Sequence, residues 1–141
     1  MRAKEYLNQA YLLNERINTK VGQLDELNGL ATHITSTISD MPKDPNHESS
    51  RLENTVIKII DLQEQINETI DELVDLKAEI MKVIDAVPDI SEKEVLERRY
   101  INMQNWGDIA DALHLGLRRL YQIHGNALLT VEGILREMSE N

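Results

Sequence analysis

The stretch NWGDIADALHLGLRRLYQIHGNAL, residues 105–128, decides the fold of the C-terminal part of the chain. Asn105 followed three residues later by Asp108 is a helix start signal, and it predicts a short helix over residues 106–113. The apolar spacing breaks at residues 114–116, which include a glycine, and then resumes in a longer helix. A short helix, a three-residue turn with a glycine and a longer helix form the arrangement of a helix-turn-helix.

The residue types in this stretch fit the packing that a helix-turn-helix requires. The longer helix is expected over residues 117–138, and Ala110 is small enough to let it approach the short helix closely. Trp106 is expected to pack in or near the core. Six apolar residues are expected to hold the helices and the turn together: Ile109, Ala110, Leu113, Leu115, Leu117 and Leu120.

The outward face of the longer helix carries side chains suited to reading DNA. In a helix-turn-helix the N-terminal end of this helix enters the major groove, where Arg suits guanine, Gln suits adenine and either binds phosphate. Arg98 and Arg99 are expected either to contact phosphate or to form salt bridges with Glu94 or Glu97, and Tyr121 fits packing and DNA contact equally well. The predicted DNA-binding residues are Arg118, Arg119, Tyr121, Gln122, Asn126, Arg98 and Arg99.

One further helix is expected before the helix-turn-helix. Pro88 ends the long helix that precedes it, because proline cannot continue a helix. Ser91 with Glu94 three residues later is a capping box, and it predicts a short helix that reaches Ile101. Residues 89–141 are therefore expected to form a three-helix module.

Residues 1–88 are expected to form a long antiparallel coiled-coil helical hairpin, so the predicted fold is all-α. Residues 39–51 contain two prolines and no apolar period, and they predict the loop. The first predicted helix has an apolar stripe at steps of three and four residues: Tyr6, Ala10, Leu13, Ile17, Val21, Leu24, Leu27, Ala31, Ile34 and Ile38. The second stripe comprises Leu52, Val56, Ile59, Gln63, Ile66, Ile70, Leu73, Lys77, Ile80 and Ile84.

The second stripe is wider than one partner helix needs. Four more apolar residues flank it: Ile57, Ile60, Val74 and Met81. This surplus predicts a further partner, which is either a second copy of the chain or the C-terminal helices of the same chain. A homo-oligomer is favoured, most simply a dimer.

Composition and charge exclude several classes of function. The chain has no cysteine, which excludes disulfides, a thiolate nucleophile and a zinc knuckle. Of its net charge of −10, most lies in residues 1–90, where 9 Lys and Arg stand against 17 Asp and Glu. Residues 98–131 instead hold four arginines against two aspartates. Acidic residues are thus concentrated in the N-terminal part of the chain, and four arginines cluster in the C-terminal part.

The protein is not expected to be an enzyme, and no metal site or cofactor is expected. The four histidines lack the spacing of a metal site, and the sequence contains no HExxH, P-loop or GxSxG motif. The N-terminus lacks the apolar run of a signal peptide, and no stretch approaches the roughly 18 apolar residues of a membrane span. The expected location is the cytoplasm of the cell that makes the protein, without a membrane partner.

Residues 94–128 resemble region 4 of sigma-70-type factors, the domain that reads the −35 promoter element. The residues that carry this resemblance are Asp108-Ile109-Ala110, Val95-Leu96, Arg99-Tyr100 and Ala127-Leu128. The chain departs from the pattern at the turn, where His114 replaces a usual Gly and Gly116 replaces a capping Ser or Thr. It departs again where Ile123 replaces a position that is often basic and His124 one that is often apolar.

The layout of the whole chain is similar to that of small prophage regulators of Gram-positive bacteria of the ArpU and RinA type. This resemblance implies sequence-specific binding to double-stranded DNA and control of phage late-gene transcription. The alternative function is a protein-interaction module that binds RNA polymerase or another regulator through its acidic coiled coil, without binding DNA. The two functions are compatible, because an activator must both find a promoter and contact the polymerase.

Overall fold

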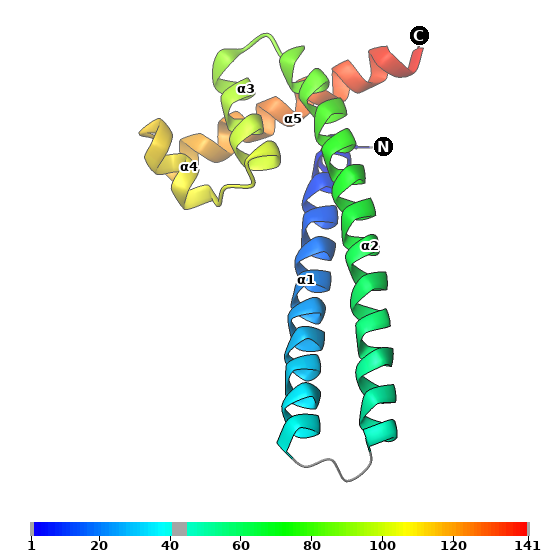
Figure 1. Cartoon of the computed structure of the whole chain (residues 1–141). Coiled ribbons are helices and arrows are strands. Elements are labelled where there is room, and N and C mark those ends of the chain that lie inside the picture. Colours follow the sequence, from blue (N-terminus) through cyan, green and yellow to red (C-terminus); the bar gives the residue numbers. More distant parts are fainter. Residues whose placement is uncertain (1, 41–44, 141) are drawn as a thin grey trace. The chain divides into compact units, whose positions relative to one another are not determined.

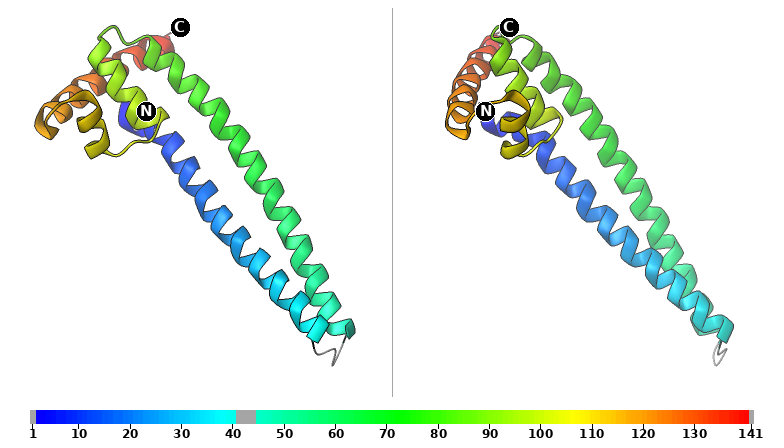
Figure 2. Two further views of the ribbon diagram at one scale, coloured as in Figure 1. Left: turned by 60° about the vertical axis from the view of Figure 1, so that its left-hand side comes forward. Right: turned by 90° about the vertical axis from the view of Figure 1, so that its left-hand side faces the viewer.

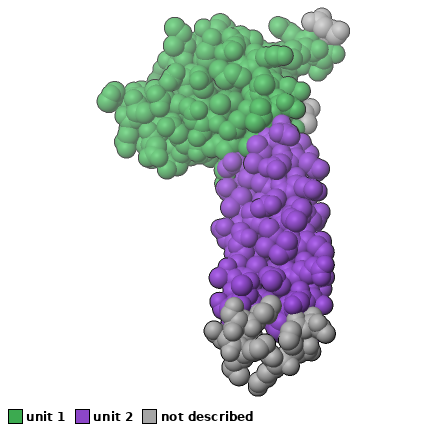
Figure 3. All heavy atoms as spheres, in the orientation of Figure 1, with its two compact units in different colours: residues 1–13, 73–141 green, residues 14–72 purple. Residues whose placement is uncertain are grey.

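The computed structural model describes residues 2–40 and 45–140, and this part of the chain is all-α (Figure 1). Contacts divide the chain into two compact units (Figure 3): unit 1 comprises residues 1–13 and 73–141, and unit 2 comprises residues 14–72. The elements in chain order are α1 (Ala3–Asp40), α2 (Pro45–Asp85), α3 (Ile90–Leu96), the π-helix η1 (Glu97–Ile101), α4 (Trp106–Leu113) and α5 (Leu117–Glu140).

Unit 2 confirms the predicted helical hairpin, with α1 and α2 lying side by side and antiparallel (Figures 1 and 2). The loop predicted over residues 39–51 is wrong for residues 39–40 and 45–51, because α1 extends to Asp40 and α2 already begins at Pro45. Proline is favoured in the first turn of a helix, where the missing N–H has no partner to lose. The rest of that predicted loop, residues 41–44, lies outside the described residues.

The seam that α2 presents to α1 keeps Ile66, Leu73 and Ile80 of the predicted stripe, but other positions are shifted by one residue. Thr55, Leu62 and Thr69 are buried, whereas the predicted seam residues Val56 and Ile70 are 40% and 39% exposed. Each threonine donates its hydroxyl to the carbonyl four residues earlier, at 2.8 and 2.9 Å. The polar atom is thereby satisfied inside the helix, and the methyl group remains free to pack. Gln63, also predicted on the seam, is exposed.

Among the stripe residues of α1 from Tyr6 to Ile34, one departs from the prediction, and the side chain of Ile38 lies outside the described residues. Val21 is 39% exposed, and the neighbouring Lys20 is half-buried instead. The long aliphatic stem of a lysine covers apolar surface while its ammonium group stays in water, so Lys20 fits a seam between two helices.

Unit 1 combines the beginning of α1 and the end of α2 with the C-terminal helices. The predicted division between residues 88 and 89 falls in the connection between α2 and α3, whereas the contacts also draw residues 1–13 and 73–88 into this unit. Its buried apolar residues are Ala3, Leu7, Ala10, Leu73, Ile80, Val83, Ile84, Val87, Val95, Leu96, Tyr100, Ile109, Ala110, Leu120, Ile123, Ala127 and Val131.

The start of α3 differs from the predicted capping box. Asp89 caps the helix, because its side-chain oxygen accepts a hydrogen bond of 3.0 Å from the backbone N–H of Glu92. Ser91 instead lies within the first turn. The carboxylate of Glu92 then accepts a hydrogen bond of 2.7 Å from the hydroxyl of Thr130, which joins α3 to α5.

None of the helices within residues 2–40 and 45–140 is long and apolar enough to span a lipid bilayer.

Candidate nucleic-acid interface

The short helix α4 has the predicted bounds and the predicted start. Asn105 is its N-cap, and the side-chain oxygen of Asn105 accepts a hydrogen bond of 2.8 Å from the backbone N–H of Asp108. The amide group of Asn105 donates a second bond of 3.0 Å to the Asp108 carboxylate. This reciprocal pair satisfies an otherwise unpaired helix donor and fixes the entry of the chain into α4.

The turn after α4 is tight because His114 adopts a left-handed conformation, with φ 54° and ψ 45°. This geometry lets the N–H groups of His114 and Leu115 donate to the carbonyls of Asp111 and Ala110, at 3.3 and 2.9 Å. The left-handed region is costly for a residue that has a Cβ atom, so His114 holds this turn at a cost that glycine would not have.

His114→Gly is therefore expected to stabilise unit 1 by about 0.5–1 kcal/mol, since relief of the strained backbone exceeds the added flexibility of the unfolded chain. Urea unfolding followed by fluorescence would measure the change. The control is Gly125→Ala, within α5, where open space surrounds the added methyl group. A lower stability of His114→Gly would show that the imidazole itself contributes to the turn.

An apolar cluster joins α3, α4 and α5. It comprises Val95, Ile109, Ala110, Leu120 and Ile123, with Trp106, Leu113 and Leu115 packed against it. The predicted packing role of Leu117 is wrong, because its side chain is 48% exposed. Ile123 takes the place in the core, three residues after Leu120 and on the same face of α5. Ile123 thus has a packing role.

The first half of α5 presents an exposed polar face. Arg119 lies beside Gln122, with 3.5 Å between its guanidinium nitrogen and the Gln122 side-chain oxygen. Residues 112–131 contain no Asp or Glu, although the chain as a whole is strongly acidic. We call this exposed set the α5 face: Arg118, Arg119, Tyr121, Gln122 and Asn126.

Arg98 and Arg99 lie on η1, are half-buried and bond within unit 1. Arg98 forms a salt bridge of 2.9 Å with Glu94 and a hydrogen bond of 3.3 Å with the Gln104 side chain. Arg99 donates to the Gln104 carbonyl at 3.1 Å and lies over the ring of Trp106, 4.6 Å from its centroid. The salt-bridge alternative is thus confirmed for Arg98, with Glu94 as its partner.

Trp106 connects η1 to the α5 face. Its ring meets Tyr121 edge to face at 5.4 Å and His124 at 4.6 Å. Together with Arg99 above the ring, these contacts join α4, which carries Trp106, to η1 and to α5. The Trp106 packing prediction is confirmed, and the contact with Tyr121 orients a member of the α5 face.

Tyr100 and His124 form a hydrogen-bonded pair that the sequence analysis missed. The Tyr100 hydroxyl and His124 Nε2 are 2.7 Å apart, and the two rings stack with centroids 5.8 Å apart. Burial raises the pKa of Tyr100 to about 12 and lowers that of His124 to about 4, with repulsion from Lys4 and Arg99 lowering the latter further. The spacing of Leu120, His124, Ala127 and Val131 on α5 could have indicated that His124 faces inward.

The low pKa of His124 predicts an acid-sensitive fold. At a pH above 6.5, its ordinary pKa, the imidazole of His124 is neutral in both the folded and the unfolded chain. Its contribution to folding stability is then fully present. As the pH falls from 6.5 towards 4, only the unfolded chain takes up the proton, and the folded state loses stability. Because the ring is partly exposed, we expect a loss of about 1–2 kcal/mol. His124→Gln should flatten this part of the curve of unfolding free energy against pH, measured by urea unfolding, and an unchanged slope would contradict the prediction.

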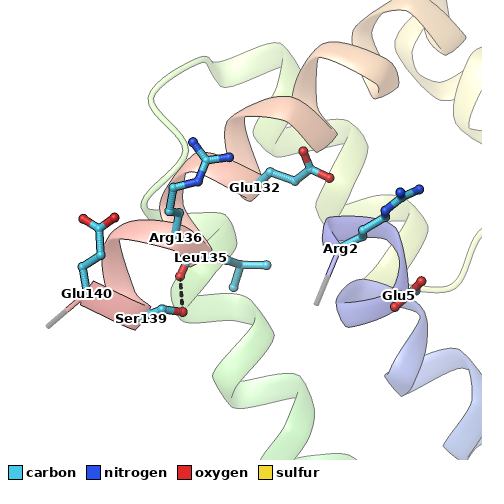
Figure 4. Close-up of a pocket in the computed structure, with 7 residues that line it drawn as sticks. All are labelled: Arg2, Glu5, Glu132, Leu135, Arg136, Ser139 and Glu140. Atoms are coloured by element: carbon cyan, nitrogen blue, oxygen red, sulfur yellow. Dashed lines mark hydrogen bonds between the residues drawn. The ribbon is translucent and has the colours of Figure 1, made fainter.

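The surface of unit 1 is hollowed beside the α5 face and near the chain ends. The first hollow, of about 400 Å³, borders the α5 face at Arg119 and is lined by Ile90, Ser91, Glu94, Val95, Leu113, Leu115, Arg119 and Ile123. The other, of about 590 Å³, is shown in Figure 4 and is lined by Arg2, Glu5, Glu132, Leu135, Arg136, Ser139 and Glu140. Its lining mixes two arginines with three glutamates, which gives it no preference for one sign of ligand charge.

No group of three metal-ligating His, Asp or Glu side chains gathers anywhere in the described part of the chain.

The comparisons with known proteins identify a family without a described activity. A family model described as "Protein of unknown function (DUF1492)" matches residues 47–132. No curated protein and no solved structure matches the chain. The matched span runs from the first turns of α2 into α5, covers more than half of the chain and contains the helix-turn-helix. The chain belongs to the DUF1492 family of proteins of unknown function.

Proposed function

We propose that this protein is a transcription regulator that binds double-stranded DNA in a sequence-specific manner. The observation that carries the proposal is the α5 face. It exposes two arginines, two side-chain amides and a tyrosine along the first half of the second helix of a helix-turn-helix. The stretch around it is free of acid in a chain of net charge −10. An anionic ligand would therefore meet its least repulsion there.

The roles of the individual residues follow from their chemistry. Arg118 and Arg119 are suited to guanine edges or phosphates, and Gln122 to an adenine edge. Asn126, one turn further along α5, would contact the groove wall or a base beyond them. Tyr121, held by Trp106, would contact the DNA backbone through its hydroxyl. Phage late genes are the target that the resemblance described above implies.

Arg98 and Arg99 belong to the proposal in a different way. Both already bond within unit 1, so a phosphate contact would compete with Glu94 for Arg98 and with the Trp106 ring for Arg99. We propose that they reach phosphate only at the edge of the interface. Their main effect would be to hold η1 against α4.

The proposal is tested by selection from a random duplex library with the purified full chain, followed by fluorescence anisotropy on the enriched duplex and a scrambled duplex of equal composition. We expect a recurring motif, tighter binding to the enriched duplex and an affinity that falls steeply between 50 and 200 mM salt, by about tenfold or more. Absence of binding to either duplex at low salt would contradict the proposal.

A second function, contact with RNA polymerase or another regulator, is favoured by the acidic surface of unit 2. Five exposed carboxylates lie within three turns of α2: Asp61, Glu64, Glu68, Asp71 and Glu72. Such a surface suits a basic protein partner. Copurification of a stoichiometric host protein, abolished by charge reversal at Glu68 and Glu72, would support this function, and it would replace the first one if the selected duplex does not bind.

A further inference from the structure

A second heptad seam runs along α2, away from the seam that faces α1. Its positions follow steps of three and four residues, the spacing of one coiled-coil face. Its members lie on an unbroken helix, so they share a face on both sides of residue 72. We call it the outer seam: Glu53, Val56, Ile60, Gln63, Asn67, Ile70, Val74 and Lys77.

The outer seam is open to solvent. Val56, Ile60, Ile70 and Val74 are 40%, 52%, 39% and 61% exposed. Glu53, Gln63 and Asn67 are exposed as well, and Lys77 is half-buried. The packing of α1 against α2 within unit 2 therefore leaves Val56, Ile60 and Ile70 uncovered.

Between its oppositely charged ends, the order of residue types on the outer seam reads the same in both directions. A two-fold axis at the level of Gln65 would place Val56 opposite Val74 and Ile60 opposite Ile70 of a second, antiparallel α2. The same axis would place Gln63 opposite Asn67. Apolar layers thus meet apolar layers, and the two central layers pair one amide with another, which is the kind of polar layer that fixes register in coiled coils.

Charge at the ends of the outer seam distinguishes the two possible directions of pairing. In the antiparallel arrangement, Glu53 of each chain lies opposite Lys77 of the other. In a parallel arrangement, Glu53 would meet Glu53 and Lys77 would meet Lys77, both repulsive. Glu64 beside the axis would face its own copy, but both carboxylates are exposed, so this repulsion is small and is screened by salt.

We propose that the occupant of the outer seam is a second copy of this chain, paired antiparallel through α2 about this two-fold axis. The proposal does not depend on DNA binding. It extends the self-association expected from the surplus apolar width to a defined face, direction and register.

Cysteine cross-linking tests direction and register, because the chain has no cysteine of its own. Full-length Glu53→Cys and Lys77→Cys proteins are oxidised separately and after mixing. Antiparallel pairing predicts a disulfide-linked dimer only in the mixture, since each cysteine lies about 36 Å along the axis from its own copy. Cross-linking of each protein alone would show parallel pairing, and no cross-link in any sample would contradict the proposed dimer. Either result would overturn the proposal.

Dimerisation of point variants, measured by sedimentation without cross-linking, tests whether the outer seam is the face that pairs. Val56→Lys places two lysines in the paired seam and is expected to weaken dimerisation by at least about tenfold. Val21→Lys is the matched control, because Val21 is as exposed as Val56 but lies on α1. Lys77→Glu should weaken the dimer, and Glu53→Lys together with Lys77→Glu should restore it. Equal effects of Val56→Lys and Val21→Lys, or failure of the charge swap to restore pairing, would overturn the proposal.

Discussion

Replacement of both Arg118 and Arg119 by alanine is expected to lower affinity for the selected duplex by about 30-fold or more. Each arginine at a groove contact contributes about 1–3 kcal/mol, and the two exposed guanidinium groups together form the positive charge of the α5 face. If they bind phosphate, the salt dependence should also become shallower, by about 0.9 in the logarithmic slope for each phosphate that is no longer neutralised. If they read bases, the preference over the scrambled duplex should fall instead.

The matched control is Arg136→Ala, an exposed arginine on the same helix, about 25 Å further along its axis. Fluorescence anisotropy at two salt concentrations measures both the affinity and the slope. Equal affinity of the double variant and the unchanged protein would place any DNA contact elsewhere on the chain. A similar loss of affinity in Arg136→Ala would indicate a general charge effect.

Leu120→Ala is expected to cost about 3 kcal/mol of the free energy of unfolding of unit 1. Leu120 is fully buried in the cluster with Val95 and Ile109, where it joins α5 to α3 and α4. Truncation of a buried leucine removes apolar packing and leaves a cavity that the neighbours only partly fill, for a typical loss of about 2–5 kcal/mol.

Urea unfolding followed by fluorescence measures this loss, with Leu129→Ala as the control on the same helix. Leu129 is 68% exposed, so its truncation should change the free energy of unfolding by less than about 0.5 kcal/mol. A loss below about 1 kcal/mol for Leu120→Ala would mean that the cluster does not hold α5 in place.

Local signals with one dominant physical cause were predictable from the sequence. The bounds of α4 and its Asn105 cap follow from a side chain that can satisfy a helix N-terminus, and the break at His114 follows from the end of the apolar period. The exposure of Arg118, Arg119 and Gln122 follows once Leu120 is placed in the core. DNA binding by these residues remains a prediction.

The choice of which of two neighbouring residues is buried at a helix contact was not predictable from the sequence. The hairpin seam uses Thr55 and Thr69 rather than Val56 and Ile70, because a threonine that bonds to its own helix packs as a small apolar residue. Hydrophobicity alone ranks these residues in the opposite order. The apolar Leu117 is likewise predicted in the core but lies exposed on α5, and Ile123 fills the core instead.

The π-helix η1 also gave no signal in the sequence. Asn102 N–H bonds to the Glu97 carbonyl five residues earlier, at 3.0 Å, and Met103, two residues after the end of η1, has a φ of 56°. Such a segment is stabilised by contacts that a sequence does not display, here the bonds from Arg98 and Arg99 to Gln104. The Tyr100–His124 pair depends on the same segment, which brings Tyr100 to α5.

The position of Trp106 gives the protein an optical reporter of its own. It is the single tryptophan of the chain, with Arg99 over its ring and with Tyr121 of the α5 face at its edge. Indole emission responds to the polarity and charge around the ring, so a ligand that displaces Arg99 or reorients Tyr121 should change its wavelength or intensity. Occupancy of the α5 face could then be titrated by intrinsic fluorescence on the unlabelled protein, while an event confined to unit 2 would leave the signal unchanged.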